Sequence, residues 1–188
     1  VNGVKYLFRK NNIDQISGVA ILRDARTVEV SPEGKVLRSE NIVIATGARP
    51  RAVPPLVLDG RVVITSREAL DLKELPSSAV IIGGGATGVE FAYLWNAYGV
   101  NVTLVELLPR LVPNEDEEIS QQLEHSFKRH GIDTKAGTRV DGIEISDGVA
   151  TVTLSGDSGA AEIDCDKVLI AIGMQGNVDG IGLEDVGV

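Results

Sequence analysis

The stretch VIIGGGATGVEFAYLWNAYGVNVTLVE, residues 80–106, places a cluster of glycines between two short apolar runs. Short β-branched runs are typical of buried strands, and the segment between them is long enough for a helix. The spacing predicts a strand over 79–82, a helix over about 86–98 that Gly99 ends, and a strand over 100–105. A strand, a helix and a second strand in this order are typical of a parallel α/β unit.

The glycines of this stretch follow the pattern G-x-G-x-x-G at Gly83, Gly85 and Gly88. The pattern alone is weak, but here it joins a predicted strand to a predicted helix, and Glu106 ends the next strand 18 residues after Gly88. A dinucleotide site has an acidic residue about 20 residues beyond its glycines. The first glycine would permit a tight turn, the second would let backbone N–H groups approach a pyrophosphate, and the third would let helix and strand pack closely.

Glu106 carries the prediction of which dinucleotide binds. Its carboxylate can accept hydrogen bonds from both hydroxyls of an adenine ribose and would repel a 2′-phosphate, which favours NAD(H) over NADP(H). Gly84 and Ala86 are also small, as close approach of a ligand requires. Two other interpretations stay open: a glycine-rich turn that serves only helix–strand packing, and a methyltransferase, which can share the glycines and the acid but normally lacks the segments that follow.

The composition predicts a folded soluble protein of one large domain or two small ones, with 188 residues and 43% hydrophobic content. Residues 1–60 hold nine Lys/Arg and six Asp/Glu, a net charge of +3. Residues 61–188 hold nine Lys/Arg and 21 Asp/Glu, a net charge of −12. No basic stripe runs along the acidic part, so we expect no nucleic-acid partner.

No apolar run approaches the ~18 residues of a membrane helix, so we expect no membrane association. Cys165 is the only cysteine, which favours an intracellular location: cytoplasmic, or the mitochondrial matrix if the source is eukaryotic.

The first sixty residues are predicted to hold short elements. Residues 1–13 resemble the end of a helix, and candidate strands follow around 16–22 and 27–31. The apolar run Ile42–Ala45 is short, β-branched and followed closely by glycine and proline, so it is predicted to be a buried strand. The three prolines of 48–55 predict a loop or linker.

Two more helices are predicted beyond residue 60. Thr65 and Glu68 have capping-box spacing, which predicts a short helix from Ser66. A longer helix is predicted over about 115–130, with acidic residues in its first turn and basic residues in its last. Its apolar face is expected to hold three residues spaced four apart, Ile119, Leu123 and Phe127.

The remaining segments complete the predicted fold class. From Gly131 onward the pattern alternates in twos, with DG and SGDSG turn signals, which predicts a strand and then a β-meander. The predicted fold is therefore α/β, with βαβαβ order and a meander attached. The histidines His125 and His130 and the acidic run 115–118 are interpreted as solvated helix surface, and we expect no metal site.

Two further stretches, IVIATGARP (42–50) and VLIAIGMQGN (168–177), repeat the pattern of an apolar strand followed by glycine. By itself this is either ordinary turn chemistry or backbone brought close to a ligand. Together with GGGATGVEFA and the strand end TLVE, in this order and spacing, these stretches resemble the FAD-dependent pyridine nucleotide–disulfide oxidoreductases. GVKYLF, TSREALDL and LVPNEDEEIS resemble the dihydrolipoamide dehydrogenases within that family. The resemblance covers essentially the whole chain and implies a Rossmann-like NAD-binding domain with part of a split FAD-binding domain.

The resemblance also implies roles for individual residues. Glu106 matches the acid that binds the ribose, and Glu90 matches a residue beside nicotinamide and flavin that pairs with a lysine of the disulfide helix. Val140 matches a residue beside the adenine, and Gly173 matches backbone near the nicotinamide. The implied NAD contacts are Gly83, Gly84, Gly85, Ala86, Thr87, Gly88, Glu90, Glu106, Val140 and Gly173, and the implied FAD contacts are Gly18, Thr46 and Gly47.

Three residues depart from the pattern of the family. Thr87 stands where isoleucine is usual, and Met174 and Gly176 stand where the family's AIGRxPN pattern has Arg and Pro. The family also has an FAD-binding glycine loop, a CxxxxC redox pair, and a His-Glu acid/base pair in a dimerisation domain, and we find none of these in the sequence. We therefore expect no catalytic residue in this chain.

The resemblance implies that 1–62 and 174–188 belong to the FAD-binding domain and that 63–173 form the NAD-binding domain. The chain is expected to be the central portion of a homodimeric flavoenzyme that oxidises dihydrolipoyl groups through a disulfide and FAD and reduces NAD⁺, and to be inactive alone. The expected partners are NAD(H) and, for the parent enzyme, the lipoyl-bearing component of a 2-oxo acid dehydrogenase complex. The alternatives are a free-standing NAD-binding or regulatory module and a sister enzyme such as a mercuric or another disulfide reductase.

Overall fold

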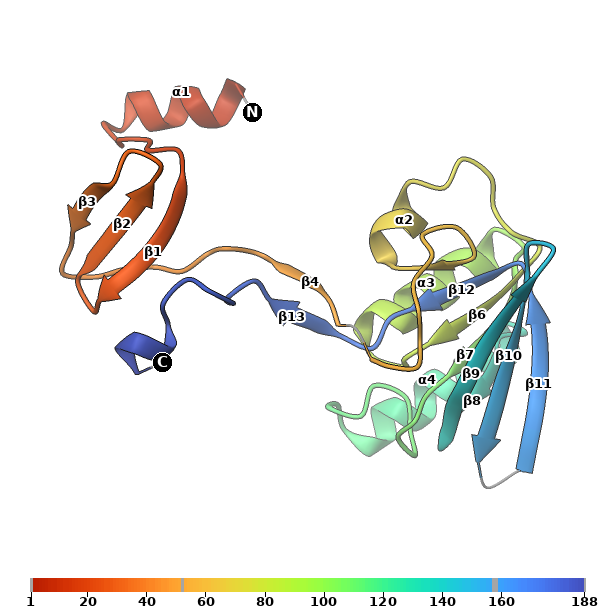
Figure 1. Cartoon of the computed structure of the whole chain (residues 1–188). Coiled ribbons are helices and arrows are strands. Elements are labelled where there is room, and N and C mark those ends of the chain that lie inside the picture. The colour runs from red at the N-terminus through yellow and green to blue at the C-terminus, as the bar shows by residue number, and fades with distance from the viewer. Residues whose placement is uncertain (1, 52, 157–158, 188) are drawn as a thin grey trace. The chain divides into compact units, whose positions relative to one another are not determined.

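The computed structural model describes residues 2–51, 53–156 and 159–187 and divides into two compact units (Figure 1). The larger unit is Arg49–Gln175, and the smaller unit combines Val1–Ala48 with Gly176–Val188. None of the helices in the described ranges combines the length and the apolar character needed to cross a bilayer. The assignment of the units to cofactor domains stays a prediction.

The larger unit is built on a five-stranded sheet with the order β5-β12-β6-β7-β8, and all four neighbouring pairs are parallel. The predicted parallel unit is confirmed, since β6 and β7 pair side by side and a helix connects them. The bounds of the five strands are β5 Val63–Ile64, β6 Ser78–Ile82, β7 Asn101–Val105, β8 Asp133–Lys135 and β12 Lys167–Ile170.

Three helices, α2 Ser66–Leu70, α3 Ala86–Ala97 and α4 Glu117–Arg129, pack against one face of this sheet. Ala79 and Ile81 of β6 lie in the same core cluster as side chains from all three helices. The helices contribute Ala69, Phe91, Ala92, Trp95 and Phe127 to this cluster. The ring centroids of Phe91 and Trp95 lie 5.6 Å apart in an edge-on arrangement.

An antiparallel meander covers the other face of the sheet (Figure 1). Its strands are β9 Thr138–Ser146, β10 Val149–Gly156 and β11 Gly159–Cys165. Val80 and Ile82 belong to the core cluster on this side. Because successive residues of a strand point to opposite faces, a strand covered on both faces must be apolar at every position, which explains the continuous run in β6.

Asp166 marks the point where the chain leaves the meander for the parallel sheet. Its carboxylate accepts hydrogen bonds from the backbone N–H groups of Ser77 and Ser78 at 2.8 and 3.0 Å, which join the beginnings of β12 and β6. Cys165 is the last residue of β11. Its side chain is buried, and burial raises the pKa of the thiol to about 11.

Helix α4 has acidic residues in its first turn and basic residues in its last, as predicted. Its buried face, however, is formed by Ser120 and Phe127 with Leu123 half-buried, whereas Ile119 is 55% exposed. The prediction that Ile119 belongs to the apolar face was therefore wrong. Neighbouring residues of a helix lie about 100° apart, so burying Ser120 turns Ile119 towards solvent.

The smaller unit contains helix α1 Asn2–Lys10, a short 3₁₀ helix η1 Glu184–Val186, and an antiparallel sheet with the order β1-β2-β3. The strands of this sheet are β1 Val19–Asp24, β2 Thr27–Ser31 and β3 Lys35–Arg38. The C-terminal segment joins this sheet, because the N–H of Leu22 donates to the carbonyl oxygen of Ile181 at 2.8 Å. Two short strands, β4 Ala48–Pro50 and β13 Met174–Gly176, form a separate two-stranded sheet, so part of the predicted loop over 48–55 is a strand.

The predicted buried strand Ile42–Ala45 is wrong. These residues form no strand, and the side chain of Val43 is 89% exposed. A strand needs hydrogen-bonding neighbours, and the described strands β1, β2 and β3 pair only among themselves. The apolar pattern is present at 42–45, but the partner strands that would bury it are not found in the described part of this unit.

Candidate functional site

The glycine stretch forms a tight turn between β6 and α3. Gly83 follows β6 directly and has a φ of +110°, a conformation that favours glycine. A Cβ at Gly83 would lie 2.5 Å from the carbonyl oxygen of Ala171, and a Cβ at Gly88 would overlap the carbonyl oxygen of Gly83. Packing of the protein against itself therefore requires glycine at these two positions.

Gly85 differs from the other two glycines of the motif. It is the N-cap of α3 with an ordinary φ of −77°, and a Cβ there would meet no atom within 4 Å. Nothing in the described protein requires glycine at this position, so packing alone does not explain the motif. The first N–H groups of a helix lack partners within the helix, and the helix dipole favours an anion beside them. The geometry at Gly85 thus suits a phosphate-bearing ligand.

Glu106 lies immediately after β7 and reaches back to the glycine turn. Its Oε2 accepts a hydrogen bond from the N–H of Gly84 at 2.5 Å, and its Oε1 accepts one from the N–H of Leu108 at 2.7 Å. The residue is 8% exposed. Each carboxylate oxygen has a second lone pair, so the group keeps acceptor capacity for ligand hydroxyls while its position is set by the backbone. The two parts of the sequence motif, 22 residues apart, therefore meet in one place.

Of the other residues predicted to contact NAD, the structure brings Thr87 and Gly173 together, whereas Glu90 and Val140 lie elsewhere. Thr87 and Gly173 line one small hollow at the carboxyl end of β12, although they are far apart in sequence. The carbonyl oxygen of Gly173 accepts a hydrogen bond from the N–H of Arg51 at 3.0 Å. Glu90 is exposed on α3. Val140 is half-buried in β9 and packs against the core cluster under the meander. The hollow is also lined by Pro50, Ser66, Ile170, Ala171 and Met174.

The three residues predicted to contact FAD belong to the smaller unit. The carbonyl oxygens of Thr46 and Gly47 accept hydrogen bonds from the side chain and the backbone N–H of Asn177, at 3.3 and 3.0 Å. Gly18 packs instead against Ser31 of β2, where a Cβ would overlap the Ser31 carbonyl oxygen. The geometry around Gly18 is accounted for by packing, whereas Thr46 and Gly47 are joined to the C-terminal segment.

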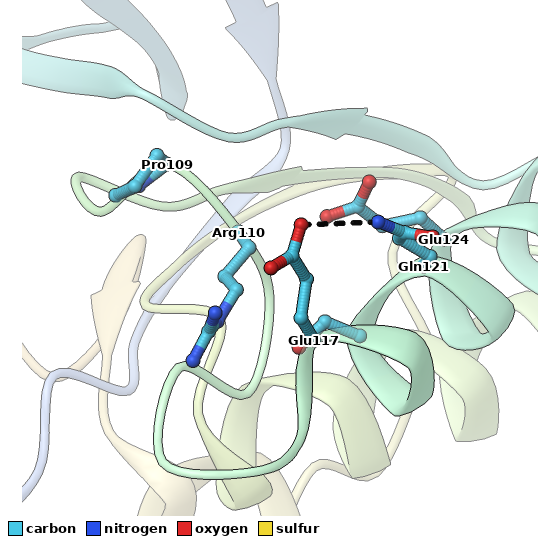
Figure 2. A pocket seen from close by; sticks show the side chains of 6 residues that line it. Pro109, Arg110, Glu117, Gln121 and Glu124 are labelled. Atoms are coloured by element: carbon cyan, nitrogen blue, oxygen red, sulfur yellow. Dashed lines mark hydrogen bonds between the residues drawn. The ribbon is translucent and has the colours of Figure 1, made fainter.

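A cavity of about 250 Å³ lies beside α4, and Gly85 is not among the residues that line it. Arg110, from the loop before α4, and Glu117 both line this cavity (Figure 2), and the Glu117 carboxylate accepts a hydrogen bond from the side-chain amide of Gln121 at 3.2 Å. The guanidinium of Arg110 donates to the carbonyl oxygens of Pro113 and Glu115, at 2.9 and 3.3 Å, and so stabilises its own loop. The cavity is lined by Pro109, Arg110, Glu117, Ser120, Gln121 and Glu124.

Sequence reasoning missed the residues that connect α4 to the glycine turn. Ser120 is 1% exposed, and its hydroxyl donates a hydrogen bond to the carbonyl oxygen of Leu111 at 2.7 Å. The carboxylate of Glu124 accepts a hydrogen bond from the N–H of Leu111 at 3.2 Å. One signal was available in the sequence: a serine three and seven residues before Leu123 and Phe127 stands on the apolar face, and a buried hydroxyl requires a partner.

The chain is similar to known proteins along its whole length. The sequence pattern of the family described as pyridine nucleotide-disulphide oxidoreductase matches residues 2–188. A dihydrolipoyl dehydrogenase from Chlorobaculum tepidum is 42% identical over 190 residues, which cover 99% of this chain and 40% of that protein. A dihydrolipoyl dehydrogenase from Mycobacterium leprae is 44% identical over 194 residues, which cover 100% of this chain and 41% of that protein. The chain thus spans about two fifths of the length of these curated relatives.

Solved structures show the same relationship. LpdA from Mycobacterium tuberculosis superposes with a TM-score of 0.81 at 29% identity, covering 100% of this chain and 42% of that chain. RclA from Escherichia coli, a HOCl-induced flavoprotein disulfide reductase, superposes with a TM-score of 0.74 at 30% identity, covering 98% of this chain and 43% of that chain. The glycine turn, the acid that meets it and these similarities agree, and the chain belongs to the pyridine nucleotide-disulphide oxidoreductase family.

Proposed function

We propose that the larger unit binds NAD(H), as the nucleotide-binding portion of a dihydrolipoyl dehydrogenase-like flavoenzyme, with residues 63–173 as its NAD domain. The observation that carries this proposal is the open space at Gly85, a glycine that no neighbouring protein atom requires. The meeting of Gly84 and Glu106 supports it, because the anion-binding end of α3 and a ribose-binding carboxylate then lie on the same turn.

The residues of the turn would divide the work of binding. Backbone N–H groups at the start of α3 would hold the pyrophosphate beside Gly85, where the dipole of the helix adds attraction. Glu106 would accept hydrogen bonds from the two ribose hydroxyls and exclude a 2′-phosphate by charge repulsion. Because Glu106 is already fixed by two backbone N–H groups, little ordering would accompany binding.

In the parent enzyme this unit would present the nicotinamide for reduction. We propose that Thr87, Glu90 and Gly173 lie on the nicotinamide side of the site and Val140 on the adenine side. FAD would contact the smaller unit at Gly18, Thr46 and Gly47. The flavin would pass electrons from a dihydrolipoyl group, through a protein disulfide, to NAD⁺, and the lipoyl group would come from a 2-oxo acid dehydrogenase complex. The chain alone is proposed to bind nucleotide without oxidising dihydrolipoamide.

A titration of the 188-residue chain with NADH, followed by nucleotide fluorescence, tests the proposal. We expect saturable binding of NADH and at least about tenfold weaker binding of NADPH, a difference of ~1.4 kcal/mol. The variant Glu106→Gln should lose most of this preference, because the repelling charge is gone. Glu118→Gln makes the same change at an exposed position of α4 and should leave both affinities unchanged.

Three results would contradict parts of the proposal. Absence of NADH binding at millimolar concentration would remove the nucleotide site itself. Equal affinity for NADH and NADPH would remove the role of Glu106. Turnover of dihydrolipoamide by the chain alone would refute its predicted inactivity, and an absorbance scan for bound flavin should accompany this assay.

A second candidate is another flavoprotein disulfide reductase, which the structural similarity to RclA favours. The identity to dihydrolipoyl dehydrogenases, 42–44%, is higher than the 30% to RclA, so we place this candidate second. Both candidates use the same nucleotide site, and they differ in the disulfide substrate.

A further inference from the structure

Two side chains of α4 hold the backbone of Leu111, in the loop between β7 and α4. The Ser120 hydroxyl donates to the Leu111 carbonyl oxygen at 2.7 Å, and the Glu124 carboxylate accepts from the Leu111 N–H at 3.2 Å. Ser120 and Glu124 are one helical turn apart and therefore lie on the same face of α4. Both backbone groups of this loop residue are thus bound by one face of one helix.

The side chain of Leu111 packs against the glycine turn at Gly84. This side chain is 0% exposed, and a Cβ on Gly84 would lie 2.7 Å from its Cδ2 atom. The next residue, Val112, donates its N–H to the carbonyl oxygen of Gly84 at 2.8 Å. On the other side, the N–H of Gly84 donates to Glu106. Gly84 is therefore held at both of its backbone polar groups, once by the β7–α4 loop and once by the acid.

We propose that Ser120 is a positioning residue for the nucleotide site: through Leu111 and Val112 it sets the position of Gly84, and with it the orientation of Glu106. The proposal rests on the proposed NAD(H) site and adds a residue that would not touch the nucleotide. Ser120 tethers the loop, Leu111 transmits its position by packing and Val112 by a hydrogen bond to Gly84.

Ser120 and Glu124 are expected to differ in importance. Ser120 is 1% exposed, so water cannot easily replace its hydrogen bond. Loss of the hydroxyl would take away the donor that it supplies to the buried carbonyl oxygen of Leu111. Glu124 is only half-buried and lines the 250 Å³ cavity shown in Figure 2, and its hydrogen bond to Leu111 is longer than that of Ser120, 3.2 Å against 2.7 Å. Loss of the hydroxyl should therefore disturb the turn more than loss of the carboxylate.

The test compares Ser120→Ala, Glu124→Ala and Ser78→Ala in the 188-residue chain. Ser78 is the matched control, because its hydroxyl accepts a hydrogen bond from the N–H of Asp166 at 3.2 Å at the opposite end of β6 from the glycine turn. We expect Ser120→Ala to weaken NADH binding by about fivefold, as loss of one buried hydrogen bond predicts, and Glu124→Ala by about twofold or less. Ser78→Ala should lower the melting temperature without changing NADH affinity.

A readout of orientation separates positioning from simple destabilisation. If Ser120 sets the orientation of Glu106, then Ser120→Ala should also narrow the preference for NADH over NADPH, measured well below its melting temperature. An unchanged NADH affinity and preference in Ser120→Ala, or an equal loss in Ser78→Ala, overturns the positioning role and leaves the NAD(H) site standing. Failure of the unmodified chain to bind NADH overturns the proposed function and this role together. Should Ser120→Ala not fold, Ser120→Cys, which keeps a weak donor, replaces it with the same expectations.

Discussion

Two stretches of this chain carry the same pattern of a short apolar run followed by glycine, and the structure treats them oppositely. Val80, Ile81 and Ile82 form β6 and are at most 6% exposed. Residues 42–45 form no strand, and Val43 and Ile44 are 89% and 39% exposed. The third stretch with the pattern, β12, pairs in parallel with β6 and is equally buried.

The difference between the two stretches lies in their neighbours. β6 has β12 on one side and β7 on the other, with helices over one face and the meander over the other. No described strand pairs with 42–45. An apolar run thus states a requirement for burial, and other parts of the chain decide whether the requirement is met.

The largest effect is expected from a matched pair of substitutions in the two stretches. Ile81→Ala removes a side chain that is 0% exposed and should cost about 3 kcal/mol of unfolding free energy, whereas Ile44→Ala, at 39% exposure, should cost less than about 1 kcal/mol. Differential scanning calorimetry of both variants provides the comparison. Similar losses in the two variants would show that 42–45 is buried in solution and would break the contrast.

A smaller effect is expected within the glycine turn. Gly88→Ala should destabilise by about 1–3 kcal/mol, because its Cβ would overlap the Gly83 carbonyl oxygen. Gly85→Ala should leave stability unchanged or raise it by about 0.5 kcal/mol, since its φ is ordinary and its surroundings are open. The same variant should nevertheless weaken NADH binding by about tenfold, or ~1.4 kcal/mol, because the added methyl group would occupy the space proposed for the phosphates. Undiminished binding by a stable Gly85→Ala would mean that the open space is not the phosphate site.

The smallest effect concerns a signal that needs no distant partner. Thr65 is the N-cap of α2; its hydroxyl accepts from the N–H of Arg67 at 3.3 Å, and Glu68 accepts from the N–H of Thr65 at 2.9 Å. Thr65→Ala should cost about 1 kcal/mol. The pKa of Glu68 is lowered mainly by the hydrogen bond that the Thr65 hydroxyl donates to it, and further by the hydrogen bond from the Thr65 backbone N–H. This contribution to stability is present above the ordinary pKa of the carboxyl and is lost as the pH falls through the lowered value.

The pH dependence provides the control for that prediction. Urea unfolding at pH 7 and below pH 4 should show a gap between wild type and Thr65→Ala that narrows in acid, as Glu68 becomes protonated in both proteins. In a Glu68→Gln background the gap should not depend on pH. A gap that widens in acid would contradict the assigned cause.

Much of the fold could be predicted because its signals are local. The turn from β6 into α3, the end of α3 before Gly99 and the capping box at Thr65 each depend on residues within one or two turns of chain. The buried face of α4 could not be predicted in the same way, since apolar spacing favoured Ile119 over Ser120. A serine is buried there only because the Leu111 carbonyl oxygen is present to accept its hydrogen bond.

The candidate site divides along the same line. Sequence alone determined the glycines, the acid 18 residues beyond them and the parallel unit that carries both, because chain stiffness and side-chain volume act over short distances. Only the tertiary structure decided that the N–H of Gly84 meets Glu106, that α4 holds the loop which packs on Gly84, and that 42–45 stays outside the described sheets. Those outcomes depend on hydrogen-bond partners and packing surfaces that come from distant parts of the chain, which a local pattern does not contain.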